Sequence, residues 1–464
     1  MSDYNLTDEL KYMQIQDKLK SRVPVKLFLD KEFLPEKSCL EKLFAISEEK
    51  SLISNIVVLP DIFCKNKNYI PGGVALTSMD TYIPKFCGSS NDSMMLFKLG
   101  IEKEELSSKK LDDLFSEIRQ KIDVYRRKKN IIDKNVLWEL LTKDKFFSPW
   151  AGIENLFFLE NFNITLSKND IKNSFPKKRP KSIPDFIPWH TIEEAGLHTI
   201  GVLDGNSHFI EFCEIVNKNQ PEISKHFELE SRYVYLAIHA GSADVGIIGH
   251  KQFLDEEYKN KVFHSGTKEF EQFEIANIAA TRFGYANRLC LATEVLLAIA
   301  KILGKEISCT LISDAPHDFV KKMAINGKTV IQHRKGAVEA LPKDFFDTKH
   351  MYGKFGKPFF FPTAPGNNSY IMINSDGNQD ALFTSSHGAG RTIDMEKASL
   401  LFNEEDLLKH TKKNNCKLFS FGKGKIASNA PSAFKSADKI KQLLKKYNLS
   451  TPVCELKPIA IIKT

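Results

Sequence analysis

The sequence lacks several patterns that would assign it to a common class of protein. Its eight cysteines include no CxxC pair and no dense, regular spacing, so neither a zinc ribbon nor a disulfide scaffold is indicated. We therefore expect reduced thiols and a cytoplasmic location. The N-terminus has no cationic segment followed by an apolar run, and no apolar stretch is long enough to cross a bilayer, which argues against secretion and membrane insertion.

Two common nucleotide-binding motifs are also missing. The chain contains no Walker A loop and no GxGxxG motif that opens a βαβ unit, so an ordinary P-loop or Rossmann site is not supported. Repeats and low-complexity segments are absent as well. The net charge of +8, from 66 Lys and Arg against 58 Asp and Glu, suits an anionic partner but is too common to identify one.

The order of local patterns predicts a mixed architecture. Residues 1–50 are charged and mostly helical in pattern, and we interpret them as an N-terminal helical appendage. Short apolar runs broken by tight turns predict strands between 56 and 98, and the alanine- and leucine-rich stretch after Glu274 predicts a long core helix. Asn326-Gly327 between β-like runs predicts a hairpin. The fold class expected is α+β, with antiparallel sheets flanked by helices.

Four of the twelve histidines stand where an apolar stretch meets a turn of small or polar residues: His208, His239, His317 and His387. For any one of them, a hydrogen-bonded turn histidine is the simpler explanation, but the four together indicate a site. Imidazole is a common ligand for divalent transition metals and also a nucleophile. Three of the histidines could therefore hold a metal ion while the fourth attacks phosphorus.

The stretch HGAGR, from His387 to Arg391, is a candidate phosphate site. We expect it at the start of a helix, where glycines let backbone N–H groups approach an anion and the helix dipole favours negative charge. Arg391 would add a fork of donors. By itself this five-residue signal is weak.

Several motifs occur together in a recognisable order. These are LPDIF, PGGVA, GVLDGNSHFIEF, IHAGSADVG, FGYANR, PHDF, HRKGAVEALP, FPTAPGNNSYIM, SSHGAGRTI and the closing LKPIAIIKT. In this order they resemble the RtcB-type RNA ligases, from about residue 55 to 464. The resemblance implies an RtcB-like catalytic domain over residues 51–464.

The resemblance also implies an activity. Members of that family use GTP and Mn²⁺ to join RNA ends that carry a 2′,3′-cyclic phosphate or 3′-phosphate to 5′-hydroxyl ends, through a histidine–GMP intermediate, in RNA repair and tRNA splicing. His387 matches the guanylylated nucleophile, and His208, His239 and His317 match metal-binding histidines. The positions that match the surroundings of the guanosine nucleotide are Ser207, Glu211, Ser369, Gly388, Ala389, Gly390 and Lys463.

The chain departs from the family pattern at the metal site. The family normally supplies an aspartate and, three residues later, a cysteine, whereas an alignment from Ile83 and Pro84 puts Ser90 and Ser93 at those positions. Neutral hydroxyls are poor substitutes for anionic ligands, so one manganese ion could remain in place of two. Cys87 or Asp92 could replace them after a change of register.

Other departures affect the same surroundings. Ser207 and Asp318 stand where the family has asparagine, Ala243 where it has arginine, and Phe63 where it has histidine. The nucleotide side of the site thus looks better retained than the metal and RNA side. Two alternatives to a ligase stay open: a non-ligating nucleotide- or RNA-binding relative with a degenerate metal site, and a single-metal phosphoesterase that uses the three histidines.

Overall fold

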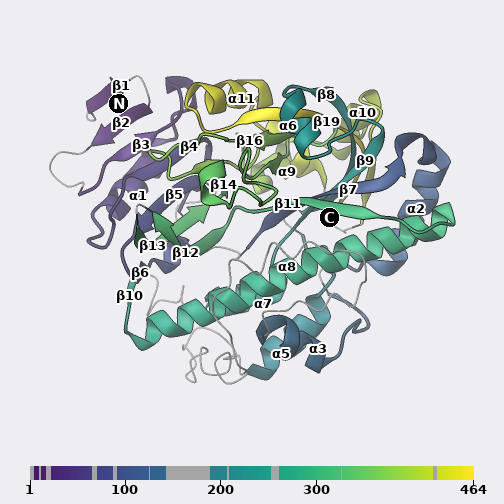
Figure 1. Ribbon diagram of the computed structural model, residues 1–464, viewed down its shortest axis with the longest axis horizontal. Coiled ribbons are helices and arrows are strands. Elements are labelled where there is room, and N and C mark those ends of the chain that lie inside the picture. The colour runs from purple at the N-terminus through teal and green to yellow at the C-terminus, as the bar shows by residue number, and fades with distance from the viewer. Residues whose placement is uncertain are drawn as a thin grey trace.

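The computed structural model describes residues 5–9, 12–16, 22–64, 70–86, 91–124, 126–142, 189–205, 208–251, 261–325, 327–421 and 426–464. The predictions made for Ser90 and Ser207 lie outside these residues. Within them, helices and largely antiparallel sheets are combined, which confirms the α+β class. Figure 1 shows the strands gathered into two large sheets above one long helix.

The first sheet has seven strands and is built mostly from the N-terminal part of the chain. Its order is β1 (Asn5–Glu9), β2 (Tyr12–Gln16), β3 (Val25–Leu27), β4 (Ile56–Phe63), β5 (Gly72–Ser78), β13 (Lys328–Lys335) and β12 (Phe319–Ile325). All neighbours pair antiparallel except β3 and β4. Ile325 pairs with Lys328 across Gly327, which has φ +73°, so the predicted hairpin is confirmed.

The second sheet has eight strands. Its order is β11 (Cys309–Pro316), β7 (Ser93–Glu102), β9 (Tyr233–Ala240), β8 (Phe209–Lys218), β19 (Thr451–Lys463), β16 (Ser369–Ile373) and β15 (Phe359–Phe361), with β18 (Lys417–Ser420) parallel to β19. Two short pairs complete the strands: β10 (Phe263–His264) with β6 (Thr81–Tyr82), and β14 (Ala337–Glu339) with β17 (Thr384–Ser386).

The long core helix predicted from the sequence is α8 (Lys268–Leu303), which begins at the N-cap Thr267 and ends at Gly304 with φ +66°. The other α-helices in the described part of the chain are α1 (Lys37–Ser47), α2 (Ser108–Lys121), α3 (Lys134–Thr142), α5 (Trp189–Thr199), α6 (Pro221–His226), α7 (Ala243–Lys251), α9 (Met395–Leu401), α10 (Glu404–Lys413) and α11 (Ala437–Lys446). In Figure 1, α8 runs diagonally below the sheets, with α3 and α5 on its other side.

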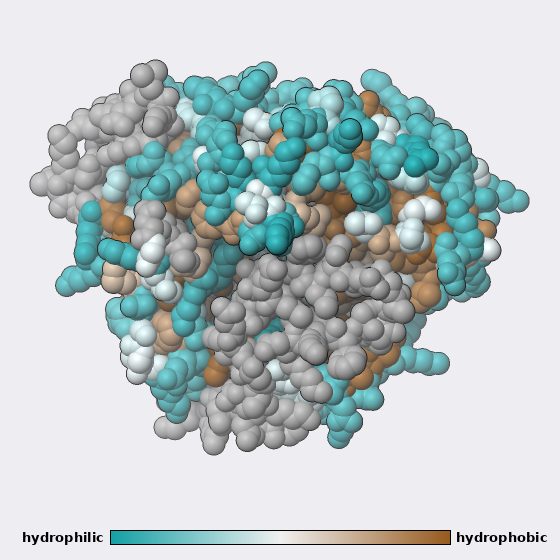
Figure 2. Space-filling view, in the orientation of Figure 1, coloured by the Kyte–Doolittle hydropathy of each residue, from teal (hydrophilic) through white to brown (hydrophobic). Residues whose placement is uncertain are grey.

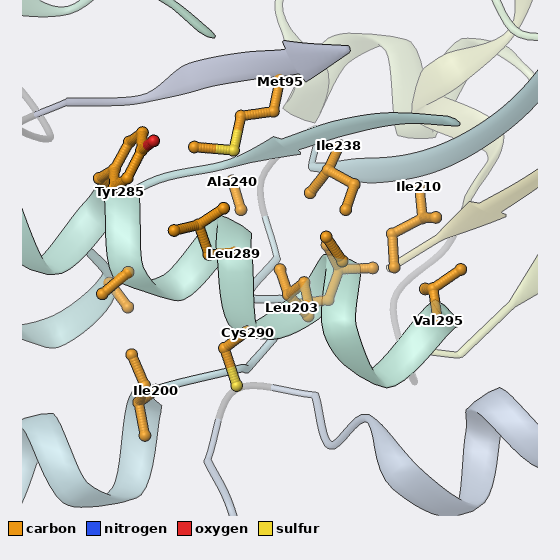
Figure 3. Packing of buried hydrophobic residues seen from close by; sticks show 14 of the residues in the cluster. Met95, Ile200, Leu203, Ile210, Ile238, Ala240, Tyr285, Leu289, Cys290 and Val295 are labelled. Carbon is orange, nitrogen blue, oxygen red and sulfur yellow. The ribbon is translucent and has the colours of Figure 1, made fainter. Parts of the chain in front are cut away.

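The largest hydrophobic core lies between α8 and the second sheet. Figure 3 shows Leu289 and Val295 of α8 among side chains of that sheet, including Ile210 and Ile238. Ile210 and Ile238 are fully buried, and burying such side chains contributes about 1.5–3 kcal/mol each. This packing fixes β8 and β9, and two of the candidate histidines stand on or directly before these strands: His208 precedes β8 and His239 lies in β9.

The helical appendage expected for residues 1–50 differs from the secondary structure observed there. Among the described residues of this range, α1 is the one α-helix, whereas β1, β2 and β3 extend the first sheet. The stretch YMQIQ alternates polar and apolar residues with a period of two, which favours a strand, and the high charge of the region concealed this signal. The expectation of reduced thiols is also corrected for one pair, because Cys39 of α1 forms a disulfide with Cys64 after β4.

Hydrophilic residues cover most of the coloured surface in Figure 2, with hydrophobic residues in smaller groups between them. Among the described helices, none combines the length and apolar character needed to span a membrane.

Candidate functional site

Strand register brings three of the four histidines to one end of the second sheet. Phe209 of β8 lies opposite His239 of β9, so His208 stands one residue beyond that pair. On the neighbouring strands, Ser93 of β7 lies opposite Pro316 of β11, so Asp92 and His317 stand one residue beyond it. The N–H of His317 donates to the carbonyl of Asp92 at 2.9 Å. Residues more than 200 positions apart in sequence thus meet at one edge.

The four histidine rings form a continuous row. Ring centroids are 4.8 Å apart for His208 and His239, 5.0 Å for His239 and His317, and 4.8 Å for His317 and His387. The last two rings are stacked, with an interplanar angle of 21°. The four residues selected from the sequence therefore form one cluster, at the place where the two large sheets meet.

The nucleophile candidate, His387, is held by a carboxylate that sequence reasoning missed. Asp61 of β4 is fully buried and accepts from His387 Nδ1 at 2.7 Å and from its backbone N–H at 3.2 Å. Its other oxygen accepts from the hydroxyl of Ser386 at 2.8 Å. Burial lowers the pKa of His387, but the hydrogen bond and charge of Asp61 outweigh it and raise the pKa above the usual value. With a proton fixed on Nδ1, the lone pair of neutral His387 lies on Nε2.

The glycine-rich turn after His387 packs tightly against β4, but it does not start a helix. His387 follows β17, and α9 begins only at Met395 with Asp394 as its N-cap. The expected helix-dipole contribution is therefore wrong, because that dipole acts only within the first turn. The glycines are explained by packing: Gly390 has φ +75°, and a Cβ there would lie 2.8 Å from Asp61.

Two further residues of the HGAGR stretch, Ala389 and Arg391, form hydrogen bonds within the chain. The backbone N–H of Ala389 donates to the carbonyl of Pro362 at 3.1 Å, and a Cβ at Gly388 would lie 3.0 Å from the same oxygen. Arg391 donates to the carbonyls of Ser428 and Ile393. Its guanidinium thus supports the turn, a use that the sequence motif did not reveal.

Three of the expected nucleotide residues meet on the second sheet. Ser369 donates to Glu211 at 3.2 Å, and Lys463 Nζ lies 5.4 Å from the ring centroid of Phe209. Burial raises the pKa of Glu211 to about 7 and lowers the pKa of Lys463 to about 7, while the charge of each partner opposes the shift. Such a buried carboxyl and amine can donate to or accept from the edge of a base.

The alignment placed Ser93 at the position of an anionic metal ligand, but the side chain that faces the histidines is the carboxylate of Asp92. Asp92 Oδ2 lies 3.7 Å from His208 Nε2. Ser93 donates to Asp314 at 2.5 Å, and Asp314 pairs with the buried Arg288 on the side of α8. Successive residues of a strand point to opposite faces, so a shift of one residue exchanges the two positions.

The pKa of His208 is shifted in the opposite direction from the pKa values of His239 and His317. Burial lowers the pKa of His208, but Asp204 and Asp92 outweigh it and raise the pKa to about 10. Burial, reinforced by the charges of neighbouring histidines, lowers the pKa of His239 and of His317 well below the usual value. Neutral imidazoles are the form in which histidine binds metal ions.

The arrangement fits a divalent ion in part. Across the described ranges, no group of three His, Cys, Asp or Glu side chains forms a complete metal-binding set. His239 Nε2 and His317 Nε2 are, however, 3.3 Å apart, and two nitrogens on one ion are separated by roughly 3.0–3.5 Å. The Nδ1 atoms of both rings are buried without a hydrogen-bond partner among the described residues. His208 has the arrangement typical of a metal ligand, because Asp204 holds its Nδ1.

Fold and site together define an α+β protein in which a histidine row ends at a buried imidazole–carboxylate pair. A sequence model of the RtcB family, described as tRNA-splicing ligase RtcB, matches residues 42–464. The chain belongs to this family.

Named relatives agree with the family assignment at low identity. The tRNA-splicing ligase RtcB of Nanoarchaeum equitans is 25% identical, with 96% of each chain covered. The protein of the same name from Methanococcus maripaludis is 24% identical over 80% of each chain. That of Thermococcus kodakarensis is 25% identical over 58% of this chain and 61% of its own length.

Proposed function

We propose that this protein is an RNA ligase that uses GTP and Mn²⁺ to join 2′,3′-cyclic phosphate or 3′-phosphate ends to 5′-hydroxyl ends. The observation that carries the proposal is the bond between Asp61 and His387, at 2.7 Å from Oδ2 to Nδ1. A histidine oriented in this way presents Nε2 as a nucleophile, and a carboxylate on Nδ1 stabilises the positive charge that develops on the ring. Membership of the RtcB family supports the reaction class.

The first step is nucleophilic substitution at the α-phosphorus of GTP. A bond forms between His387 Nε2 and phosphorus, and the bond to pyrophosphate breaks. Where the RNA ends in a cyclic phosphate, water first breaks the bond from phosphorus to the 2′-oxygen and leaves a 3′-phosphate. The 3′-phosphate then takes the guanylate from His387, and a 5′-hydroxyl displaces GMP as the RNA strands join. Within the chain, Asp61 holds the proton on Nδ1 throughout the first step.

Glu211, Ser369 and Lys463 would bind and orient the guanosine, since they are buried polar groups gathered on one sheet. His208, His239 and His317 would hold the manganese ion, whose contribution is to neutralise charge on phosphate oxygens. The packed turn of Gly388, Ala389 and Gly390 fixes His387 relative to both groups.

The test is covalent labelling. Purified protein is incubated with α-³²P-labelled GTP and Mn²⁺ and separated on a denaturing gel, beside His387→Ala and the control His226→Ala. His226 lies away from the row and bonds to the carbonyl of Met351. We expect label in wild type and in His226→Ala but none in His387→Ala. Label that persists in His387→Ala would place the nucleophile elsewhere.

A second candidate function is nucleotide or RNA binding without ligation. It is favoured by the incomplete metal-binding set in the described part of the chain. The two candidates differ in the ligation of RNA that carries a cyclic phosphate and a 5′-hydroxyl, since only a ligase converts these ends to a joined product.

A further inference from the structure

Asp92, the residue directly before β7, has its carboxylate beside the histidine row. We propose that Asp92 is an anionic ligand of the divalent ion held by this row, in a coordination set of imidazole nitrogens and carboxylate oxygen. This inference rests on the proposed function and names the residue that supplies negative charge to its metal site.

The first argument is direction. Asp92 is the residue immediately before β7, and Ser93, the first residue of that strand, points to Asp314 and Arg288. Asp92 Oδ2 instead approaches His208 Nε2. Asp92 Oδ1 lies against Gly241, where a Cβ would be 1.8 Å from this oxygen. The backbone around Asp92 is also fixed, since its carbonyl accepts from the N–H of His317.

The second argument is spacing. An imidazole nitrogen and a carboxylate oxygen on one ion lie roughly 3.0–3.5 Å apart. His239 Nε2 and His317 Nε2 are already 3.3 Å apart, and His208 Nε2 is 3.7 Å from Asp92 Oδ2. The two pairs are adjacent, because the rings of His208 and His239 are in edge contact at 4.8 Å. Shifts of a few tenths of an ångström in the second pair would give ligand spacing.

The third argument is charge. The Nδ1 atoms of His239 and His317 have no hydrogen-bond partner among the described residues. Imidazole is neutral when it binds a metal ion, so histidine ligands alone do not compensate a divalent cation in a buried site. Asp92 supplies one negative charge beside them. Carboxylate oxygen and imidazole suit Mn²⁺, whereas thiolate favours softer ions such as Cd²⁺.

The experiment measures metal affinity in the absence of GTP and RNA. Full-length wild type, Asp92→Asn and the matched control Ser93→Ala are titrated with Mn²⁺, and the free ion is followed by electron paramagnetic resonance. We expect Asp92→Asn to bind Mn²⁺ more weakly by at least on the order of 10–100-fold, because that loss is typical when a residue that only hydrogen-bonds to a metal ligand is replaced. Ser93→Ala should bind Mn²⁺ as wild type does. Equal affinity in wild type and Asp92→Asn, or an equal loss in Ser93→Ala, would overturn the proposal.

A second variant keeps the proposal open to refutation if Asp92→Asn fails to fold. Asp92→Cys retains an anionic ligand but makes it soft, so its affinity for Cd²⁺ relative to Mn²⁺ should rise at least tenfold. An unchanged ratio contradicts direct coordination. Metal binding that depends on Asp92, without any covalent label from GTP, would refute the proposed ligase chemistry while leaving this inference intact.

Discussion

Lys435 holds the main chain on both sides of Asp61. Its Nζ donates to the carbonyls of Pro60 at 2.9 Å and Ile62 at 2.8 Å, and its backbone N–H donates to the carbonyl of Gly390 at 3.0 Å. One residue thus connects the strand that carries the carboxylate with the turn that follows His387. The geometry of the imidazole–carboxylate pair depends on this connection.

We therefore predict that Lys435→Met slows covalent guanylylation of His387 more than it weakens GTP binding. Loss of two charge-assisted hydrogen bonds should also lower the free energy of unfolding by about 2–4 kcal/mol. Labelling rates are measured in single turnover below the melting temperature, and GTP affinity is measured by equilibrium dialysis without Mn²⁺.

Two variants control this prediction. Lys439→Met removes an exposed lysine that pairs with Glu32, and such surface pairs contribute little, so its labelling rate should match wild type. Lys435→Arg keeps the donors and should recover part of the rate. Equal rates in Lys435→Met and wild type would remove Lys435 from any positioning role.

Asp61→Asn should reduce the labelling rate by on the order of 10²–10⁴-fold. The amide can donate to Nδ1, which places the imidazole proton on Nε2 and removes the nucleophilic lone pair. Measured rates are compared with those of Asp380→Asn, which removes a surface partner of Lys26. A loss of less than about threefold in Asp61→Asn would mean that the tautomer of His387 is not set by Asp61.

The sequence allowed the four histidines to be selected, because each stands where an apolar, strand-like run meets a turn of small or polar residues. It could not reveal Asp61 as their partner, since 326 residues separate it from His387 and pairing across two sheets leaves no local pattern. The available signal was a carboxylate inside the apolar run IVVLPDIF, because a buried charge needs a partner.

The sequence also could not show which side chain before β7 faces the metal site, because this depends on the exact register of the strand. An alignment anchored on Ile83 and Pro84 gave Ser93 the position of an anionic ligand, and a shift of one residue reverses which side chain faces the histidines. The helix expected at HGAGR failed for a different reason: a glycine-rich turn that packs on β4 has the same composition as a helix N-terminus.

Stability should depend on pH through Glu339. This buried carboxyl pairs with Lys321 and with Arg334 at 3.0 Å, and although burial raises its pKa, these cations outweigh burial and hold the pKa well below the usual 4.5. A folded-state pKa below the unfolded value stabilises the fold fully above pH 4.5 and progressively less as the pH falls below it.

Glu339→Gln should accordingly lower the free energy of unfolding by about 3–5 kcal/mol at neutral pH, because the buried Arg334 and the partly buried Lys321 lose their partner. The difference from wild type should narrow in acid. Urea titrations across this range test the prediction, with Glu405→Gln, an exposed residue paired with Lys409, as control. A difference that stays constant with pH would show that the charge of Glu339 is not its source.

Core packing beneath the site should affect stability without changing the chemistry. Ile238 is fully buried between α8 and the second sheet, and it precedes His239 on β9, so its side chain points away from the histidine row. Ile238→Ala should lower the free energy of unfolding by about 2–5 kcal/mol, while the folded protein still forms the covalent label. Val216→Ala removes a half-exposed branched residue from β8 and should change stability by less than about 0.5 kcal/mol. If Ile238→Ala abolished labelling while fully folded, the site would depend on strain transmitted through β9 and not on the backbone position of His239 alone.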